Sequence, residues 1–217
     1  KVILLVNLDS GSGAAIIAKA KEAGARVIDY DRLTIDTDNA ASVYVSFDNV
    51  AVGKAMGDTL EPLINALGKS PARVVQLNGS PTDNNATLFR EGYYGVAKPH
   101  YDDGSWELVA DQAVPGWDNQ QALTIFQQIL TDAGNNVDAV FAANDGLANS
   151  VISALMTAGL EPMPVSGQDA TVAGIQNVLS GWQIVSRYKE ESEQYDVWLR
   201  ADQEFRGNPQ TLDTLSI

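Results

Sequence analysis

The chain has 217 residues and 45% hydrophobic content, enough for one substantial domain or two small ones. Its net charge is -14 with only 14 Lys and Arg, which argues against a nucleic-acid partner, because phosphate binding needs clustered basic side chains. Cysteine is absent, which excludes thiol nucleophiles, thiolate metal sites and disulfides, and the longest apolar runs are too short to cross a bilayer.

Apolar runs and segments with helical spacing alternate along the chain. The first run, 1–6, is continuously apolar, as is typical of a strand buried on both faces of a parallel sheet. Strands are expected at 1–6, 26–30, 43–47, 73–77, 106–110, 137–142, 164–166 and 183–186, and helices at 14–23, 49–67, 84–98, 118–131, 145–158, 171–179 and 190–205. This alternation predicts an α/β fold with one doubly wound parallel sheet, or two.

The loop that follows the strand at 73–77 is the most informative stretch. Asp83 or Asn84 can cap the helix that begins there. Three consecutive carboxylate or amide side chains, ending at Asn85, with Arg90 about two turns further on, exceed what a cap requires. At the carboxyl edge of a parallel sheet such a set could bind a polyhydroxylated molecule. The alternative is a well-capped helix with a surface arginine.

A glycine-rich turn, Gly11-Ser12-Gly13, follows the first strand and opens a helix, and Asp31 lies at the end of the next strand. This is the outline of a dinucleotide site and leaves open a nucleotide-dependent enzyme. The third position is Ile16, however, where close helix packing favours Gly or Ala. An ordinary crossover turn explains the same residues.

Hydrolytic catalysis by a serine triad has little support in the sequence. The only histidine, His100, is expected on the surface, in a turn between a helix ending at Pro99 and a strand. No Gly-x-Ser-x-Gly motif is present. We therefore expect no catalytic residues and no enzyme, and neither a cofactor nor a metal.

Polar side chains follow five of the expected strands, where the carboxyl ends of parallel strands meet. Carboxylates and amides exchange hydrogen bonds with sugar hydroxyls, arginine donates in two-pronged fashion, and tryptophan covers the apolar face of a pyranose. Although a single such residue is usually a helix cap, the whole set indicates a shared cleft. Its members are Asp31, Arg32, Asp83, Asn84, Asn85, Asn144, Asp145, Gln168, Asp169 and Lys189, joined by Trp117.

At these residues the chain resembles the periplasmic monosaccharide-binding proteins of ABC importers, and is most similar to the xylose-binding type. The resemblance is carried by the segments 30–33, 46–49, 79–81, 83–85, 89–90, 116–117, 143–145, 166–170 and 188–189. It implies two doubly wound parallel-sheet lobes of the periplasmic-binding-protein type, joined by three hinge strands and closing over one sugar. Residues 48–188 would form a complete C-terminal-type lobe, and 1–47 with 189–217 a partial N-terminal-type lobe.

The same resemblance implies a set of sugar contacts and a role. The contacts are Asp31 and Arg32 from the partial lobe, Asn85, Arg90, Trp117, Asn144 and Asp169 from the complete lobe, and Lys189 at the hinge. The expected role is to capture xylose or a similar pentose or hexose and deliver it to the membrane permease of an ABC importer. The expected location is periplasmic or extracellular, without membrane insertion by this segment.

Relatives of this type begin with two further strand-helix units and continue beyond Ile217. We therefore expect the chain to be truncated at both ends, and a lipid anchor in a missing N-terminus stays open. A second reading is the sugar-responsive effector domain of a lactose-repressor-like transcription regulator, which shares the fold and would need a basic helix-turn-helix upstream. The acidic balance and the loop at 83–85 favour the transport protein.

Overall fold

The structure is a computed structural model and describes residues 1–35, 40–182, 187–190 and 193–196. Helices and strands alternate along the chain, as the sequence predicts. They are β1 (Val2–Leu5), α1 (Ala14–Glu22), β2 (Arg26–Tyr30), β3 (Val43–Val45), α2 (Asn49–Ala66), β4 (Ala72–Asn78), α3 (Asn84–Asp102), β5 (Trp106–Ala113), the short 3-10 helix η1 (Pro115–Trp117), α4 (Asn119–Asp132), β6 (Ala139–Ala142), α5 (Asp145–Ala158), α6 (Val172–Ser180), β7 (Arg187–Glu190) and β8 (Glu193–Asp196).

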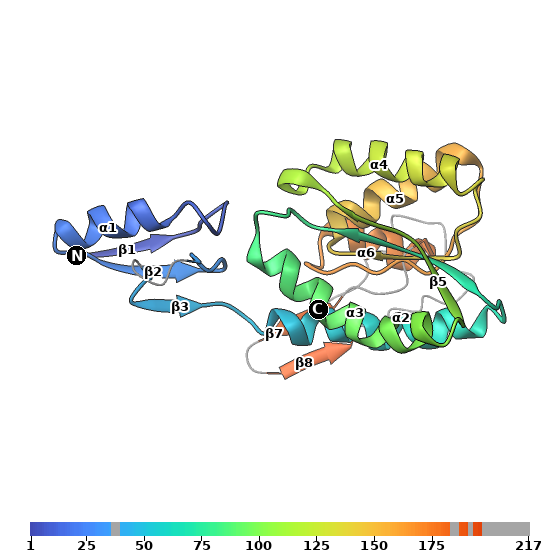
Figure 1. Cartoon of the computed structure of the whole chain (residues 1–217), viewed down its shortest axis with the longest axis horizontal. Coiled ribbons are helices and arrows are strands. Elements are labelled where there is room, and N and C mark those ends of the chain that lie inside the picture. The colour runs from blue at the N-terminus through green and yellow to red at the C-terminus, as the bar shows by residue number, and fades with distance from the viewer. Residues whose placement is uncertain (36–39, 183–186, 191–192, 197–217) are drawn as a thin grey trace, which may run out of the picture.

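The strands form two parallel sheets and one antiparallel pair. The first sheet has the order β1-β2-β3 and the second β5-β4-β6, and a parallel bridge between Val140 and Val165 extends the second sheet beyond β6. The chain passes from the first sheet to the second between β3 and α2 (Figure 1). The predicted parallel α/β fold is confirmed, whereas the domain boundaries at 47/48 and 188/189 stay a prediction.

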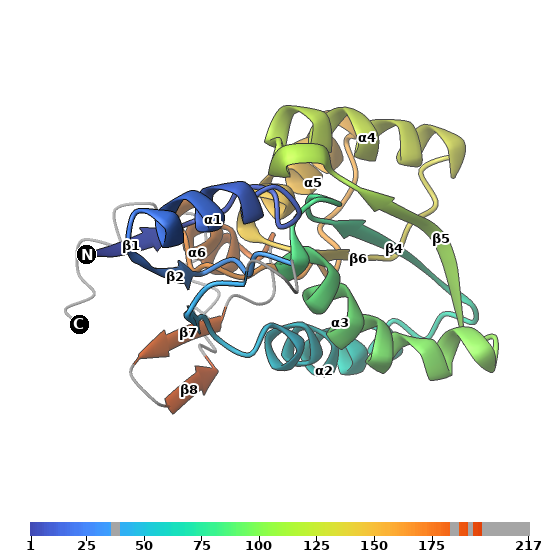
Figure 2. The same ribbon diagram turned by 60° about the vertical axis from the view of Figure 1, so that its left-hand side comes forward.

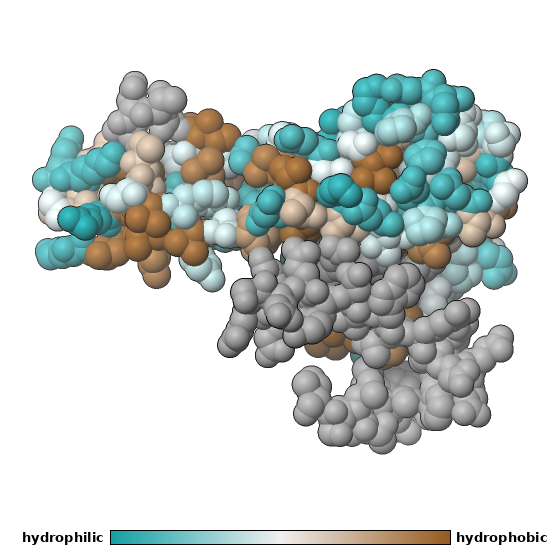
Figure 3. All heavy atoms as spheres, turned by 90° about the horizontal axis from the view of Figure 1, so that it is seen from below, coloured by the Kyte–Doolittle hydropathy of each residue, from teal (hydrophilic) through white to brown (hydrophobic). Residues whose placement is uncertain are grey.

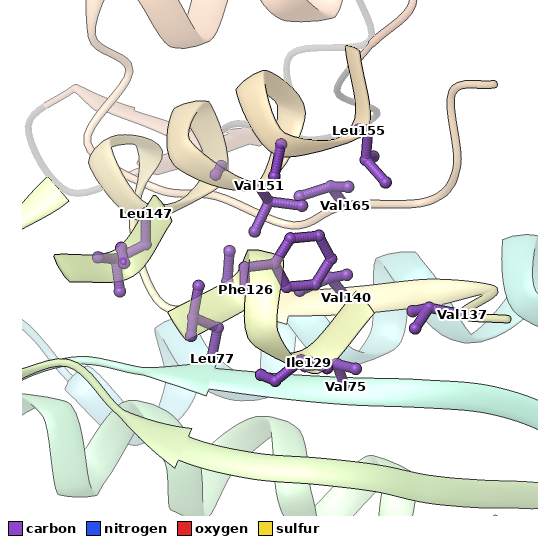
Figure 4. Packing of buried hydrophobic residues seen from close by; sticks show 14 of the residues in the cluster. Val75, Leu77, Phe126, Ile129, Val137, Val140, Leu147, Val151, Leu155 and Val165 are labelled. Carbon is purple, nitrogen blue, oxygen red and sulfur yellow. The ribbon is translucent and has the colours of Figure 1, made fainter. Parts of the chain in front are cut away.

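The second sheet is buried on both faces. Helices α2 and α3 cover one face and α4 and α5 the other (Figures 1 and 2). On the α4–α5 side, Val75 and Leu77 of β4 pack with Phe126 and Val140 (Figure 4). On the other side Tyr93 stacks on Phe141, with ring centroids 5.4 Å apart. These two apolar layers hold the carboxyl edge of the sheet in place.

The first sheet is covered much less. Helix α1 buries Ile17 against Val27, but Val2 and Leu4 of β1 remain 63% and 68% exposed. Apolar surface is visible over this part of the molecule (Figure 3, left). The expectation that the first strand is buried on both faces is therefore wrong, because the buried cluster of this sheet is formed by α1, Ala25 and Val27 and leaves Val2 and Leu4 outside it.

Two predicted helix boundaries also differ from the structure. Helix α3 runs through Pro99 to Asp102, so His100 lies in its last turn instead of in a loop. The missing N–H of Pro99 leaves only the carbonyl of the exposed Gly95 without its usual donor, and water can replace that donor. The predicted helix 190–205 is wrong where the structure describes it, because β8 is a strand that pairs with β7. The rest of that prediction, 191–192 and 197–205, lies outside the described residues, and so does the predicted strand 183–186.

Candidate ligand-binding site

The polar residues selected from the sequence lie at the carboxyl ends of the parallel strands. Asp31 follows β2, Trp117 follows β5 and Asn144 follows β6. The loop 79–83 follows β4, and Asp169 comes after the bridge at Val165. In open α/β proteins, ligands bind at this edge.

Asp83 joins the two sheets at this edge. Its buried carboxylate accepts the backbone N–H of Asn85 at 3.0 Å, which caps α3, and the indole N–H of Trp117 at 2.9 Å. The Arg32 Nε lies 3.2 Å from the Asp83 Oδ2. This contact is an ion pair without hydrogen-bond geometry, because the buried Nε has no hydrogen-bond partner among the described residues.

Asp31 and Arg32 stand side by side at the end of β2. The Arg32 Nε lies 3.7 Å from a carboxylate oxygen of Asp31, which is partly exposed. Burial raises the pKa of Asp31, the Arg32 charge lowers it and the Asp83 charge raises it again, so that the pKa ends above its ordinary value. The pair offers a ligand one carboxylate and the guanidinium nitrogens of Arg32 beyond the buried Nε, of which Nη1 also donates to the Leu8 carbonyl at 3.4 Å.

Asn85 is occupied mainly by protein contacts. Its amide nitrogen donates to the backbone carbonyl of Asp31 at 3.1 Å, and its amide oxygen accepts from Asn49 at 3.1 Å. One amide hydrogen remains for a ligand. The sequence selected Asn85 as a sugar contact, and the structure gives it a contact with the opposite lobe as well.

Arg90 belongs to a second polar network. Two of its nitrogens pair with both carboxylate oxygens of Asp111, and its guanidinium carbon lies 4.9 Å from the centre of the Tyr94 ring. Asn78 donates to the same carboxylate at 2.6 Å and accepts from the buried Tyr93 hydroxyl. Burial would raise the pKa of Asp111, but these hydrogen bonds outweigh it and lower the pKa. Arg90 is thus held in one orientation.

Trp117 is fixed by the loop after β4. A side chain at Gly79 would lie 2.1 Å from the Trp117 ring, so only glycine allows the indole to pack there. The indole N–H is tied to Asp83. Gly79, which belongs to the segment 79–81 that carries the family resemblance, therefore makes room for the aromatic ring.

Asn144 and Asp169 form the far side of the site. The Asn144 side chain caps α5 through the N–H of Leu147 at 2.9 Å and lies 3.4 Å from a carboxylate oxygen of Asp169. Asp169 is exposed as a residue, yet protein atoms crowd its carboxylate. This desolvation, followed by the charge of Asp145 and, to a smaller degree, of Asp31, raises the pKa of Asp169 to about 6. Asp31 follows a strand of the first sheet, whereas Asp169 follows the bridge that extends the second.

Backbone strain concentrates at the same residues. Among the described residues, five non-glycine residues have positive φ, and three of them are Asp31 (67°), Trp117 (57°) and Asp169 (99°). Such conformations cost of order 1–3 kcal/mol each and collect at functional sites. The strain independently marks three of the residues that the sequence selected.

The glycine-rich turn and His100 fall outside this group, whereas the sugar contact of Lys189 stays a prediction. Gly13 begins α1 in a helical conformation, and a side chain there would meet Asn7 and Thr34 at 2.4 and 2.6 Å, which explains the glycine by packing. His100 pairs with Glu61 and stacks on Trp106. Lys189 lies in β7, opposite Gln194 of β8.

Sequence reasoning missed Ser10. It follows β1 as the other site residues follow their strands, and this position was the one available signal. Ser10 is buried, and its side chain accepts the N–H of Asn84 at 3.0 Å. Among the described residues, no group of three or more His, Cys, Asp or Glu could hold a metal ion, and none of the helices is long and apolar enough to span a membrane.

Comparison with known proteins gives one consistent result. The chain is 37% identical over 189 residues to the D-xylose-binding periplasmic protein of Escherichia coli (strain K12), covering 87% of this chain and 55% of that protein. The protein of the same name from Haemophilus influenzae is 39% identical over 175 residues, covering 80% and 51%. The chain therefore spans about half the length of the curated relatives it matches.

Solved structures agree. An ABC transporter solute binding protein from Clostridium phytofermentans with bound β-D-glucose superposes with a TM-score of 0.80 at 34% identity, covering 87% of this chain and 61% of that one. The structure of a carbohydrate transporter solute binding protein from Chloroflexus aurantiacus in complex with D-glucose gives 0.80 at 27% identity, covering 87% and 62%. With the family model for the periplasmic binding protein domain matching residues 1–197, the chain belongs to the periplasmic binding protein domain family.

Proposed function

We propose that the protein to which these residues belong binds a monosaccharide, xylose or a similar pentose or hexose, between its two sheets. The main observation behind this proposal is that Arg32, after a strand of the first sheet, lies 3.2 Å from Asp83, after a strand of the second. The charge of Asp31 beside Arg32 also contributes to the raised pKa of Asp169 on the side of the second sheet. Two sets of sugar-compatible groups thus face each other. The relatives named above support this ligand class.

The proposed contacts are the residues selected from the sequence, each with its own chemistry. Asp31 and Asp169 accept hydroxyl hydrogens, Arg32 and Arg90 donate, and Trp117 offers an apolar ring. Asn85 and Asn144 each retain hydrogen-bonding capacity beyond the contacts described. Lys189 joins the set by the resemblance alone. Closure of the lobes over the sugar, rather than chemistry on it, would be the function, so we propose no enzymatic step.

Delivery to the permease of an ABC importer, outside the cytoplasmic membrane, completes the proposal. It rests on the family and on the relatives, which are periplasmic sugar-binding proteins. None of the relatives named here is a transcription regulator, and no observation favours that alternative.

The test is calorimetric titration of the full natural protein with D-xylose, D-glucose, D-galactose and L-arabinose. One of these sugars is expected to bind in the micromolar range or tighter. Arg90→Ala and Asp169→Ala should each raise Kd by about 10- to 100-fold or more, the loss of a charged hydrogen bond. Lys98→Ala is the matched control, because it removes an exposed cation from the same helix as Arg90. Wild-type affinity in both site variants would refute the assigned site.

A further inference from the structure

Four consecutive residues at the start of α3 each contact the first lobe. The Thr82 carbonyl accepts the Ser10 N–H at 2.9 Å, and Asp83 pairs with Arg32 at 3.2 Å. The Asn84 N–H donates to the Ser10 hydroxyl at 3.0 Å, and the Asn85 amide donates to the Asp31 carbonyl at 3.1 Å. We call the two contacts that Ser10 makes with Thr82 and Asn84 the interlobe latch.

We propose that this latch, and Ser10 in particular, holds the lobes closed and sets the affinity of the site without touching the ligand. Resting on the function proposed above, it adds Ser10 as a positioning residue that the sequence analysis did not select. Neither hydrogen bond of Ser10 to the second lobe involves a group proposed to contact sugar.

Ser10 is built for this role. It is 3% exposed, and its own carbonyl accepts the N–H of Ile35 at 2.7 Å, which fixes its backbone within the first lobe. Its hydroxyl then satisfies an N–H in the first turn of α3, a group that lacks an intrahelical partner. Opening the lobes exchanges both interlobe hydrogen bonds for bonds to water, so the latch contributes to the equilibrium between closed and open states.

This arrangement has a measurable signature. A closure equilibrium multiplies the affinity for every sugar by the same factor, because the fraction of closed protein is independent of which ligand follows. A residue that touches sugar hydroxyls instead changes the ratio of affinities between epimers. The latch is therefore distinguished from a ligand contact by comparing several sugars.

The experiment uses the full natural protein with Ser10→Ala, Ser10→Thr and Ser12→Ala. Ser12 is the matched control, because it lies in the same loop and its hydroxyl donates to the backbone carbonyl of Asp9 within the first lobe. Ser10→Ala should raise Kd by about three- to tenfold for each sugar that binds, the loss of one hydrogen bond, with the change mainly in the dissociation rate. Ser10→Thr keeps the hydroxyl acceptor, so its Kd should stay nearer the wild-type value. Ser12→Ala should bind with the wild-type Kd.

A second readout works without any sugar. These 217 residues contain no cysteine, so once any cysteine elsewhere in the full protein is replaced by serine, spin labels can be placed at Lys19→Cys on α1 and Gln127→Cys on α4, both exposed. Their distance distribution should shift toward the open form in Ser10→Ala and remain unchanged in Ser12→Ala. This shift would support the latch even if the protein bound none of the sugars tested. Failure to bind any of them would instead refute the proposed function.

Two results would overturn the latch. One is an unchanged distance distribution together with unchanged Kd values in Ser10→Ala. The other is a Kd change that differs between sugars, since it would place Ser10 against the ligand.

Discussion

The two parallel sheets of this chain have similar strands but different surroundings. In the second sheet, Val74, Val75 and Leu77 of β4 are fully buried between two helical layers, whereas in the first sheet Val2 and Leu4 of β1 are mostly exposed. Both strands are apolar runs, so the difference comes from what packs against them. An apolar strand sequence indicates that burial of both faces would be favourable. Whether the strand is buried depends on which other elements pack against it.

The largest expected effect is loss of the second sheet's core. Phe126→Ala removes a fully buried ring that packs beside Leu77 and Val140, and we expect the free energy of unfolding to fall by about 3–5 kcal/mol. Ile16→Ala on α1 is the comparison, because this side chain is 49% exposed and its loss should change stability by less than about 0.5 kcal/mol. Urea denaturation measures both. Equal losses would contradict the contrast between the sheets.

The second effect tests how closely α2 and α3 pack. A side chain at Gly92 would lie 2.3 Å from the backbone of Lys54 and of Val50, so Gly92→Ala should destabilise by about 1–3 kcal/mol or more. Gly95→Ala on the same helix meets nothing within 4 Å and should stabilise by about 0.5–1 kcal/mol through helix propensity. Thermal denaturation of the two variants checks the opposite signs, and a stable Gly92→Ala would mean that the helices lie further apart.

The third effect is a pH dependence of stability at the edge of the second sheet. The pKa of Asp169 is raised to about 6 from an unfolded value of about 3.9, so the folded state holds this proton more tightly. Its stabilising contribution is complete below about pH 4 and is lost as the pH rises through about 6. Asp169→Asn should flatten this part of the stability curve. If the stability curve of the variant has the same slope as that of the wild type, the pKa of Asp169 is not raised by folding.

The smallest effect tests whether the two sheets meet at their carboxyl edges. The charge of Asp31 in the first sheet is one of the causes that raise the pKa of Asp169 in the second. Asp31→Asn should therefore lower the pKa of Asp169 below about 6, measured by carboxyl NMR titration. Asp9→Asn, which changes another partly exposed carboxylate of the first lobe, is the control and should leave the pKa of Asp169 in place. An unchanged pKa of Asp169 in Asp31→Asn would show that the carboxyl edges of the two sheets do not lie close together.

Much of the fold and part of the site could be predicted from local sequence. Helices α2, α3, α4, α5 and α6 start where capping residues predict, since Asp48, Asp83, Asp118, Asn144 and Thr171 each accept an N–H from the first turn. The polar residues after the strands collect at the carboxyl edges, because parallel strands bring those ends together. The predicted end of α3 at Pro99 was wrong, because a proline near a helix end costs little when the carbonyl it leaves unpaired faces water.

The sequence by itself determined the order of strands and helices as far as α6, the caps and the family, since these depend on residues close together in the chain. Only the tertiary structure decided that Ser10 completes the start of α3, that Asn85 holds the opposite lobe, and that Val27 is buried while Leu4 is not. These contacts join residues far apart in sequence. Whether they form depends on how the whole chain packs, and the residues next to each partner in the sequence do not specify that packing.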